Sequence, residues 1–210
     1  MSPRPRTVSD AAILAATHRV IGRVGPNRLT LAEVAAEVGL APATLVQRFG
    51  SRRELLLALV QSGSETVEEC FARMRGDHDS PLAALVEAAT VLSRVMRTPA
   101  EIAHGLAFLQ MDVTDPAFQR LAEAHARHTI EGYRRLLAEA VAAKELRPTD
   151  TARLARAVSA VAGGSLINWG MLQKGDVERW VREDLETLLA PLRTGRKAPA
   201  RRRYPPTRKR

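Results

Sequence analysis

Residues 29–55 constrain the fold of this chain more than any other stretch. They read LTLAEVAAEVGLAPATLVQRFGSRREL. Thr30 and Glu33 have the spacing of a capping box, in which each side chain accepts from the other residue's backbone N–H at the start of a helix. Gly39 follows that helix, where the backbone often needs a positive φ, and Pro42 suits the first turn of the next helix. The pattern predicts three short helices joined by tight turns, which is the sequence form of a helix-turn-helix.

The second of these helices has an outer face suited to the major groove of DNA. Leu45 and Phe49 are four residues apart and share the face that we expect to turn inward. Ser51 and Glu54 predict a second capping box, which opens the next helix. A surface helix with a few polar residues is common, so an ordinary solvent-facing helix is the alternative. The outer face, with Val46 at its edge, consists of small and polar residues: Ala43, Thr44, Gln47 and Arg48.

An amphipathic helix upstream extends the pattern. It ends at Gly25, and its apolar face consists of Ile13, Ala16, Val20 and Val24. From about Ile13 to Leu56 the chain resembles the tetracycline-repressor (TetR) family of bacterial transcription regulators. The resemblance implies an all-α fold of about nine helices, with an N-terminal three-helix helix-turn-helix DNA-binding domain plus a larger helical ligand-binding and dimerisation domain. It is carried by Ile13-Leu14, Ala16, Gly25, Thr30, Ala35, Gly39, Thr44-Leu45, Phe49, Ser51 and Glu54-Leu55.

The resemblance also implies which residues bind DNA. Three positions depart from the family pattern. Val46 stands where a phosphate-binding Tyr is usual, Arg52 stands where Lys is usual, and Ala41 stands where a helix-capping Ser is frequent. These departures affect single DNA contacts and not the domain as a whole. The expected phosphate contacts are Thr30 and Arg52, and the expected recognition-helix contacts are Pro42, Ala43, Thr44, Gln47 and Arg48.

The rest of the chain has helical spacing and no alternating strand pattern. The first helix after the helix-turn-helix begins with Arg52 at the DNA and ends in the larger domain, so it would pass a change in one part to the other. We divide the chain into a disordered basic arm (1–8), a helix-turn-helix domain (9–55), a ligand-binding and dimerisation domain (56–193) and a disordered basic tail (194–210). Turn signals place the remaining helices near 52–75, 80–96, 99–111, 116–144, 150–174 and 177–192.

The last two predicted helices have the composition of an oligomer interface. Helix 150–174 is rich in small residues, and its Gly163-Gly164 pair costs helix stability of about 1 kcal/mol per glycine relative to alanine. Such glycines are tolerated where another backbone comes close. A homodimer with a four-helix interface, as the family resemblance implies, would supply the second recognition helix that specific binding needs. Packing within one chain is the alternative. The candidate interface residues are Ala155, Ser159, Ala162, Gly163, Leu166, Val181, Leu185 and Leu188.

An effector cavity is expected among the middle helices. Helix 116–144 carries His125 and Tyr133 on an otherwise apolar stripe, and His104 is a neighbour to consider. The inner stripes carry few charges, which favours a small, mainly apolar effector. Each of these residues could instead belong to an ordinary core. The candidate ligand contacts are Phe71, Met74, Met96, Phe108, Met111, His125, Tyr133, Asn168 and Trp169.

The net charge of +9 comes mostly from the end of the chain. Residues 196–210 hold eight Lys and Arg and no acid, which leaves +1 for the rest. The prolines in this tail argue against a helix, so we expect disorder. Two interpretations stay open, a solubilising end or an arm that binds DNA without sequence preference. Residues 1–7, with Arg4 and Arg6, resemble a shorter arm of the same kind.

Other classes of protein find little support. The single cysteine, Cys70, excludes an intrachain disulfide and a Cys-based zinc site. His125, His128 and Glu131 have the spacing of ligands on one helical face, but no second cluster is near in sequence, so we expect no metal and no cofactor. The chain lacks the Gly-rich nucleotide motifs, the His-Glu-x-x-His motif and the Gly-x-Ser-x-Gly motif, so we expect no enzyme.

The sequence therefore favours a DNA-binding regulator that acts in the cytoplasm, because no stretch reads as a membrane span or a secretory signal. We expect a repressor that binds an inverted-repeat, double-stranded operator as a homodimer and that a small effector releases. The alternative is a DNA-binding activator or architectural protein without ligand control. An all-helical enzyme or carrier is a remote third possibility.

Overall fold

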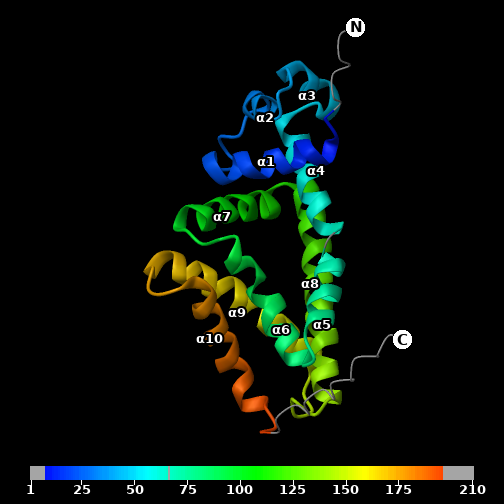
Figure 1. Ribbon diagram of the computed structural model, residues 1–210, viewed down its shortest axis with the longest axis vertical. Helices are drawn as coiled ribbons and strands as arrows, with labels where there is room; N and C mark the ends of the chain where they lie inside the picture. The colour runs from blue at the N-terminus through cyan, green and yellow to red at the C-terminus, as the bar shows by residue number, and fades with distance from the viewer. Residues whose placement is uncertain (1–7, 66, 196–210) are drawn as a thin grey trace, which may run out of the picture.

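The computed structural model describes residues 8–65 and 67–195, with only the backbone given at 63–65. The described part is helical, apart from an isolated bridge between Leu146 and Arg193, so the predicted all-α fold is confirmed. Figure 1 shows the arrangement. The elements are α1 (Asp10–Val24), α2 (Leu31–Glu37), α3 (Pro42–Phe49), α4 (Arg52–Glu65), α5 (Val67–Asp77), α6 (Pro81–Thr90), the 3-10 turn η1 (Val91–Arg94), α7 (Pro99–Thr114), α8 (Pro116–Ala142), α9 (Thr151–Leu172), α10 (Val177–Leu189) and the 3-10 turn η2 (Ala190–Leu192).

Local sequence signals set the helix starts. The N–H of Glu33 donates to the hydroxyl of Thr30 (3.2 Å) and the N–H of Thr30 donates to the carboxylate of Glu33 (2.9 Å), so the predicted capping box is confirmed. At α4 only half of the predicted box forms. The N–H of Glu54 donates to the hydroxyl of Ser51 (3.2 Å), whereas the Glu54 carboxylate accepts from Arg53 (2.8 Å).

Two predicted helices have different bounds in the structure. The helix expected at 80–96 ends at Thr90 and continues as the tighter turn η1, within which the hydroxyl of Ser93 donates to the Thr90 carbonyl (2.5 Å). Leu92 lies in this turn and is about half exposed. The segment expected as one helix over 52–75 is described as α4 and α5 on either side of residue 66, which lies outside the described residues.

The folded part continues past the predicted start of the tail. Thr194 donates its N–H to the Glu145 carbonyl (3.1 Å) and also donates its hydroxyl to the carbonyl of Lys144. These bonds tie the chain end to the loop between α8 and α9, so residue 194 belongs to the larger domain. The predicted disorder of residues 1–7 and 196–210 concerns segments outside the described residues.

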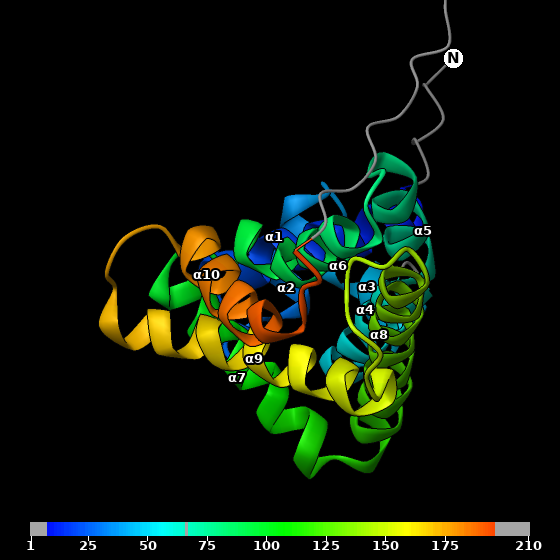
Figure 2. The same ribbon diagram turned by 90° about the horizontal axis from the view of Figure 1, so that it is seen from below.

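The apolar side chains form two cores. Helices α1–α4 enclose the smaller core, which includes Ile13, Leu45 and Leu55, and α5–α10 enclose the larger core around Leu85 and Leu137. Figure 1 shows the small domain at one end of the molecule, with α4 and α8 running from it into the larger domain and α7 lying beneath α1. Seen from below in Figure 2, α10 lies alongside α9.

The two domains are joined by residues at the start of α8. Phe118 belongs to α8, yet its ring is only 2% exposed and lies in the small core. Arg53, at the start of α4, donates two hydrogen bonds of 2.9 Å to the carboxylate of Asp115, and its guanidinium lies 6.0 Å from the centre of the Phe118 ring. Arg53 and the N–H of Ala117 lower the pKa of Asp115 from its ordinary 3.8 to about 2. The junction therefore combines an apolar insertion with an ion pair.

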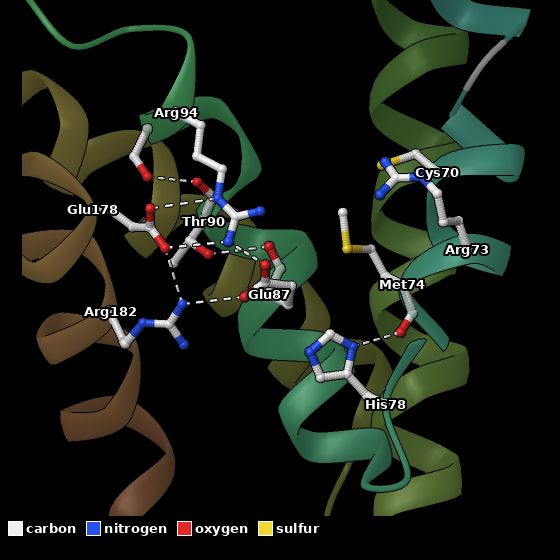
Figure 3. A network of polar contacts seen from close by, with 10 residues as sticks. Cys70, Arg73, Met74, His78, Glu87, Thr90, Arg94, Glu178 and Arg182 are labelled. Carbon is white, nitrogen blue, oxygen red and sulfur yellow. Dashed lines mark hydrogen bonds and ion pairs between the residues drawn. The ribbon is translucent and has the colours of Figure 1, made fainter. Parts of the chain in front are cut away.

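A second polar network ties α6 and η1 to α10 (Figure 3). Arg182 of α10 donates to Glu87 of α6 (3.2 Å) and to Glu178 (3.2 Å), and Arg94 of η1 pairs with both carboxylates. Burial works against the ionised form of Glu87, but the hydrogen bonds from Arg94 and Arg182 outweigh it and lower the pKa of that carboxyl. This network closes the side of the larger domain that lies away from α8.

The ion pair at the junction predicts a specific dependence of stability on pH. Because the folded pKa of Asp115 is below its ordinary value, its contribution is fully present above about pH 4 and is lost as the pH falls towards 2. We expect Asp115→Asn, which keeps an acceptor for Ala117, to lose less unfolding free energy than the wild type between pH 5 and pH 2.

The measurement is urea unfolding at a series of pH values. Arg53→Met should flatten the same pH dependence from the other side of the pair. If both variants follow the wild-type pH profile, the junction ion pair does not stabilise the fold.

Candidate nucleic-acid interface and effector cavity

Helix α3 presents the face that the sequence predicted. Leu45 is fully buried and Phe49 half-buried, so both hold α3 against the small core. The N-terminal residue Ala41 forms no side-chain cap, as its departure from the family pattern implies, and Pro42 occupies the first turn. Of the predicted recognition-helix contacts, Thr44 is half-buried, the side chain of Arg48 is mostly covered, and the others are exposed: Pro42, Ala43 and Gln47. This face can contact base edges.

The expected phosphate contacts flank α3 on the surface. Thr30 caps α2 and is exposed, and its hydroxyl also donates to Glu33 (2.8 Å). Arg52 lies in the first turn of α4, where the helix N-terminus favours anions, and it donates to the carbonyl of Asn27 (2.9 Å). Both residues therefore lie where a DNA backbone could reach them.

Arg48 is held within the protein instead of extending outward, a contact that the sequence pattern did not reveal. Its guanidinium donates to the carbonyl of Val8 (2.6 Å) and pairs with the carboxylate of Asp10 at the start of α1. Only 26% of the Arg48 side chain is exposed. We call the contacts of Arg48 with Val8 and Asp10 the Arg48 latch. A direct contact between Arg48 and DNA would require this latch to open.

The helix-turn-helix is braced by a second ion pair. Arg23 and Arg19 of α1 donate to Glu37 at the end of α2 (2.8 and 3.0 Å) and lower the pKa of its carboxyl. These two ion pairs fix α2 against α1 on the surface of the small domain. Because Arg48 also pairs with Asp10, α1 is bound to both helices of the motif.

The candidate ligand contacts do not gather around one cavity. Phe71, Met74 and Tyr133 are buried in the larger core, where the rings of Phe71 and Tyr133 meet edge to face at 5.2 Å. Burial raises the pKa of Tyr133 to about 12, so its phenol stays neutral. These three residues fill the space that the sequence analysis assigned to an effector, because Gly132 of α8 leaves room for the Phe71 ring.

Three further candidates lie elsewhere. Trp169 is buried, and its indole N–H donates to the carbonyl of Gly175 (3.1 Å), so it closes the loop after α9. His125 is exposed on α8 and Asn168 is exposed on the side of α9 that borders α10. The predicted stripe on α8 does face inward at Tyr133, but it is exposed at His125.

A cavity does exist, at the boundary between the two domains. It has a volume of about 280 Å³ and is lined by α1, α4, the segment before α7, and α7 itself; we call it the junction cavity. Met96 and Phe108 of the predicted set line it, with His104, whereas Met111 packs with Phe108 against the small core. Helices α1 and α4 contribute residues that no sequence pattern indicated, because no pattern shows which helices cross: His18, Arg19, Ile21, Gly22 and Leu59.

The predicted dimer residues divide between the inside and the outside of the chain. Five of the eight are buried within the chain's own larger core and leave no surface for a partner: Ala155, Ala162, Leu166, Val181 and Leu185. The other three, Ser159, Gly163 and Leu188, are partly or fully exposed. The small residues of α9 therefore serve intrachain packing on one face, which corrects that part of the prediction.

The outer face of α9 is nonetheless apolar. Together with α10 it forms an open groove of about 390 Å³ that includes Gly164 and Leu188. Ile167, Met171 and Leu172 on α9 are exposed, Met171 by 69%. A side chain added at Gly163 or Gly164 would meet nothing within 4 Å, so the surface at the glycines is open.

No three His, Cys, Asp or Glu side chains of the described residues come together as metal ligands. No helix of the described part is both long enough and apolar enough to cross a membrane.

Comparison with known proteins agrees with this geometry. Residues 13–59 match the family described as bacterial regulatory proteins, tetR family. The chain is 30% identical over 176 residues to the HTH-type transcriptional regulator BetI of Rhizobium meliloti (strain 1021), covering 78% of this chain and 76% of that protein.

Solved structures share the fold at low sequence identity. A TetR transcription regulator from Haloarcula marismortui ATCC 43049 matches with a TM-score of 0.75 and 15% identity, covering 88% of this chain and 97% of that one. The transcriptional regulator FadR from Bacillus subtilis, in complex with stearoyl-CoA, matches with a TM-score of 0.67 and 16% identity, covering 86% and 97%.

Substituting the two residues of the Arg48–Asp10 ion pair should have opposite effects on DNA binding. Asp10→Ala should free Arg48 and remove a negative charge beside α3, tightening DNA binding by up to about 1 kcal/mol, the ceiling for an exposed pair. Arg48→Ala should weaken binding by about 1–3 kcal/mol. Fluorescence anisotropy with a DNA fragment selected by the protein measures both.

Glu139→Ala is the control, because it removes one exposed acid from an ion pair with Arg75, far from α3. Tighter binding by Asp10→Ala than by this control supports a restraining latch. Weaker binding by Asp10→Ala would mean that the latch holds Arg48 in the position that DNA requires.

Proposed function

Because the chain belongs to the TetR family of bacterial regulatory proteins, it is a DNA-binding transcription regulator and not an enzyme, and we propose that it binds an inverted-repeat operator as a homodimer. A small, mainly apolar effector would release it from the DNA, so that it acts as a repressor. The regulator would work in the cytoplasm, where bacterial DNA lies.

The observation that carries the DNA-binding part is the geometry of α3. Its apolar side is buried through Leu45, and its outer side offers Gln47 beside small residues that allow close approach to base edges. Arg52 at the N-terminus of α4 supports a phosphate contact next to it. One such helix reads only a few base pairs, which supports binding as a dimer to two half-sites.

The outer face of α9 supports the proposed dimer. Ile167, Met171 and Leu172 on it are exposed in the described part of the chain, and the open space at Gly163 and Gly164 would let a second helix come close. The hydroxyl of Ser165 on α9 donates a hydrogen bond to the carboxylate of Asp184 on α10 (2.6 Å), so both helices would enter the interface as one unit. We propose that the partner is a second copy of this chain.

Effector control is supported by the fold and by one neighbour. FadR of Bacillus subtilis was solved with stearoyl-CoA, which has a long apolar chain. In the present chain the larger core is filled, and the junction cavity is the mainly apolar space that touches the small domain. An activator or architectural protein without ligand control is the second candidate, which the filled core favours.

The basic ends of the chain fit the same function. Residues 196–210 carry eight positive charges, and Arg4 and Arg6 precede α1. We propose that they add affinity for any DNA sequence by releasing counterions.

The DNA-binding proposal predicts the form of the operator. Selection from a random DNA pool should yield inverted repeats whose half-site centres lie about one helical turn, roughly 34–36 Å, apart. Gln47→Ala should weaken binding to the selected site by about 1–3 kcal/mol and relax base preference in each half-site. Gln110→Ala, on the exposed side of α7, is the control. Recovery of sequences without repeats, or unchanged preference in Gln47→Ala, would contradict this assignment.

The dimer proposal predicts that bulk on the outer face of α9 separates the protomers. Gly164→Leu should cost the dimer about 1–3 kcal/mol, because overpacking forces closely approaching helices apart. The monomer should stay folded, since the added side chain meets nothing within 4 Å. Gly76→Leu on α5, another exposed helical glycine in open space, is the matched control. Light scattering at low micromolar concentration reads the result, and a Gly164→Leu protein that is still dimeric would place the interface elsewhere.

A further inference from the structure

We propose that the junction cavity binds a neutral, mainly apolar molecule with a single hydrogen-bonding group, and that its occupancy controls the affinity for DNA. The inference rests on the proposed function and names the place and chemical class of the effector. Figure 1 shows why the place matters, because α7 of the larger domain lies directly beneath α1 of the DNA-binding domain there.

The walls of the junction cavity are mainly apolar and come from both domains. Ile21 of α1 faces it from the DNA-binding domain, Phe108 of α7 from the larger domain, and Leu59 of α4 from the helix that connects them. Met96, just before α7, completes this surface. An occupant would therefore bury apolar area against three separate elements at once.

The charged groups at the cavity already have partners. Arg19 pairs with Glu37 at 3.0 Å. Glu101 accepts three hydrogen bonds from the backbone and side chain of Thr98 and from the N–H of Arg97, because it caps α7. Neither has a strong demand for a charged ligand, which favours a neutral one.

One polar atom of a residue that lines the cavity has no hydrogen-bond partner among the described residues. It is the Nδ1 atom of His104, which is fully buried although the imidazole lines the cavity. A buried polar atom left unpaired costs free energy, so a ligand that pairs with it gains affinity. Depending on the tautomer, Nδ1 accepts from a hydroxyl or donates to a carbonyl. Turned toward the cavity by a rotation of the His104 ring, this atom would supply the single polar contact.

The volume sets the size of the ligand. At about 30 Å³ for each water molecule, 280 Å³ holds roughly nine waters, and hence a compound of about ten non-hydrogen atoms. Two fused aromatic rings with one hydroxyl, as in 2-naphthol, match this size and chemistry. Long acyl chains exceed it.

An occupant of the junction cavity would act on DNA binding directly. It would fix α1 relative to α7, and α1 is tied to α2 through Glu37 and to α3 through the Arg48 latch. The recognition helix would thus lose freedom to adjust to the spacing of the two half-sites. A ligand shifts an equilibrium only by its differential affinity for the two arrangements, so DNA must weaken ligand binding by the same factor.

Gly22 provides a clean test, because it lines the cavity and a Cβ added there meets nothing within 4 Å. Gly22→Phe should fill the cavity from α1 and abolish binding of 2-naphthol in calorimetry of the full chain. Gly22→Ala is the matched control, since it also removes the helical glycine but leaves the cavity open, and it should bind like the wild type. Leu59→Trp fills the cavity from α4 and guards against a folding defect in Gly22→Phe.

His104 tests the polar contact. His104→Phe keeps a ring of similar shape and should weaken binding of 2-naphthol by about threefold to tenfold, the range for one lost hydrogen bond. The anion 2-naphthoate should bind the wild type more weakly than 2-naphthol does, because the neighbouring charges are already paired.

The regulatory part is measured with the selected operator. Saturating 2-naphthol should lower operator affinity of the wild type at least about fivefold. Gly22→Phe should show that lowered affinity without the compound and should not respond to it. Operator binding by the wild type alone tests the proposed function separately.

Three outcomes would overturn the inference. These are no binding of 2-naphthol up to about 1 mM, equal binding by the wild type and Gly22→Phe, or binding that leaves operator affinity unchanged.

Discussion

The insertion of Phe118 into the small core is the contact on which the arrangement of the two domains depends. The ring leaves the larger domain at the start of α8 and is buried among the apolar side chains of α1–α4. Full burial of a phenylalanine contributes about 1.5–3 kcal/mol, and a domain of this size buries too little area to be stable with ease on its own. The DNA-binding domain therefore takes part of its core from its neighbour, and Arg53 and Asp115 hold the same point by charge.

This shared core changes how a signal would cross the molecule. The sequence suggested that the helix beginning at Arg52 passes a change from one domain to the other, with an effector bound among the middle helices. In the structure the far end of that segment lies near Phe71 and Met74, which are packed in a filled core. The contacts between domains are instead concentrated at α7 and α8, through Phe108 and Phe118. Movement of α8 must carry the small domain with it or withdraw the buried ring of Phe118, and movement of α7 disturbs the partly buried ring of Phe108, so the junction is the sensitive part of the chain.

The sequence predicted what local chemistry determines. The capping box at Thr30, the positive φ of Gly39 and the proline start of α3 follow from neighbours along the chain, and all appear in the structure. What failed depends on which faces meet across the fold. Helical spacing placed His125 and Tyr133 on one stripe without showing that Tyr133 is buried and His125 exposed, and nothing local to Arg48 revealed its pairing with Asp10. The junction cavity could not be predicted from the sequence for the same reason, since it exists only where α1 crosses α7.

The predicted dimer interface on α9 named mainly the inner face of the helix, although its outer face also exposes apolar residues. A helix that is apolar all round must be covered on both sides. On α9, Ala155 and Leu166 face the chain's own core, while Ile167 and Met171 face outward beside glycines that leave open space. The small-residue pattern did not distinguish these two faces, so the inner one was assigned to the partner. Burial of the inner face leaves the exposed apolar side chains of the outer face still in contact with water. It leaves the outer face, extended by Leu188 of α10, as the surface that a second copy would have to bury.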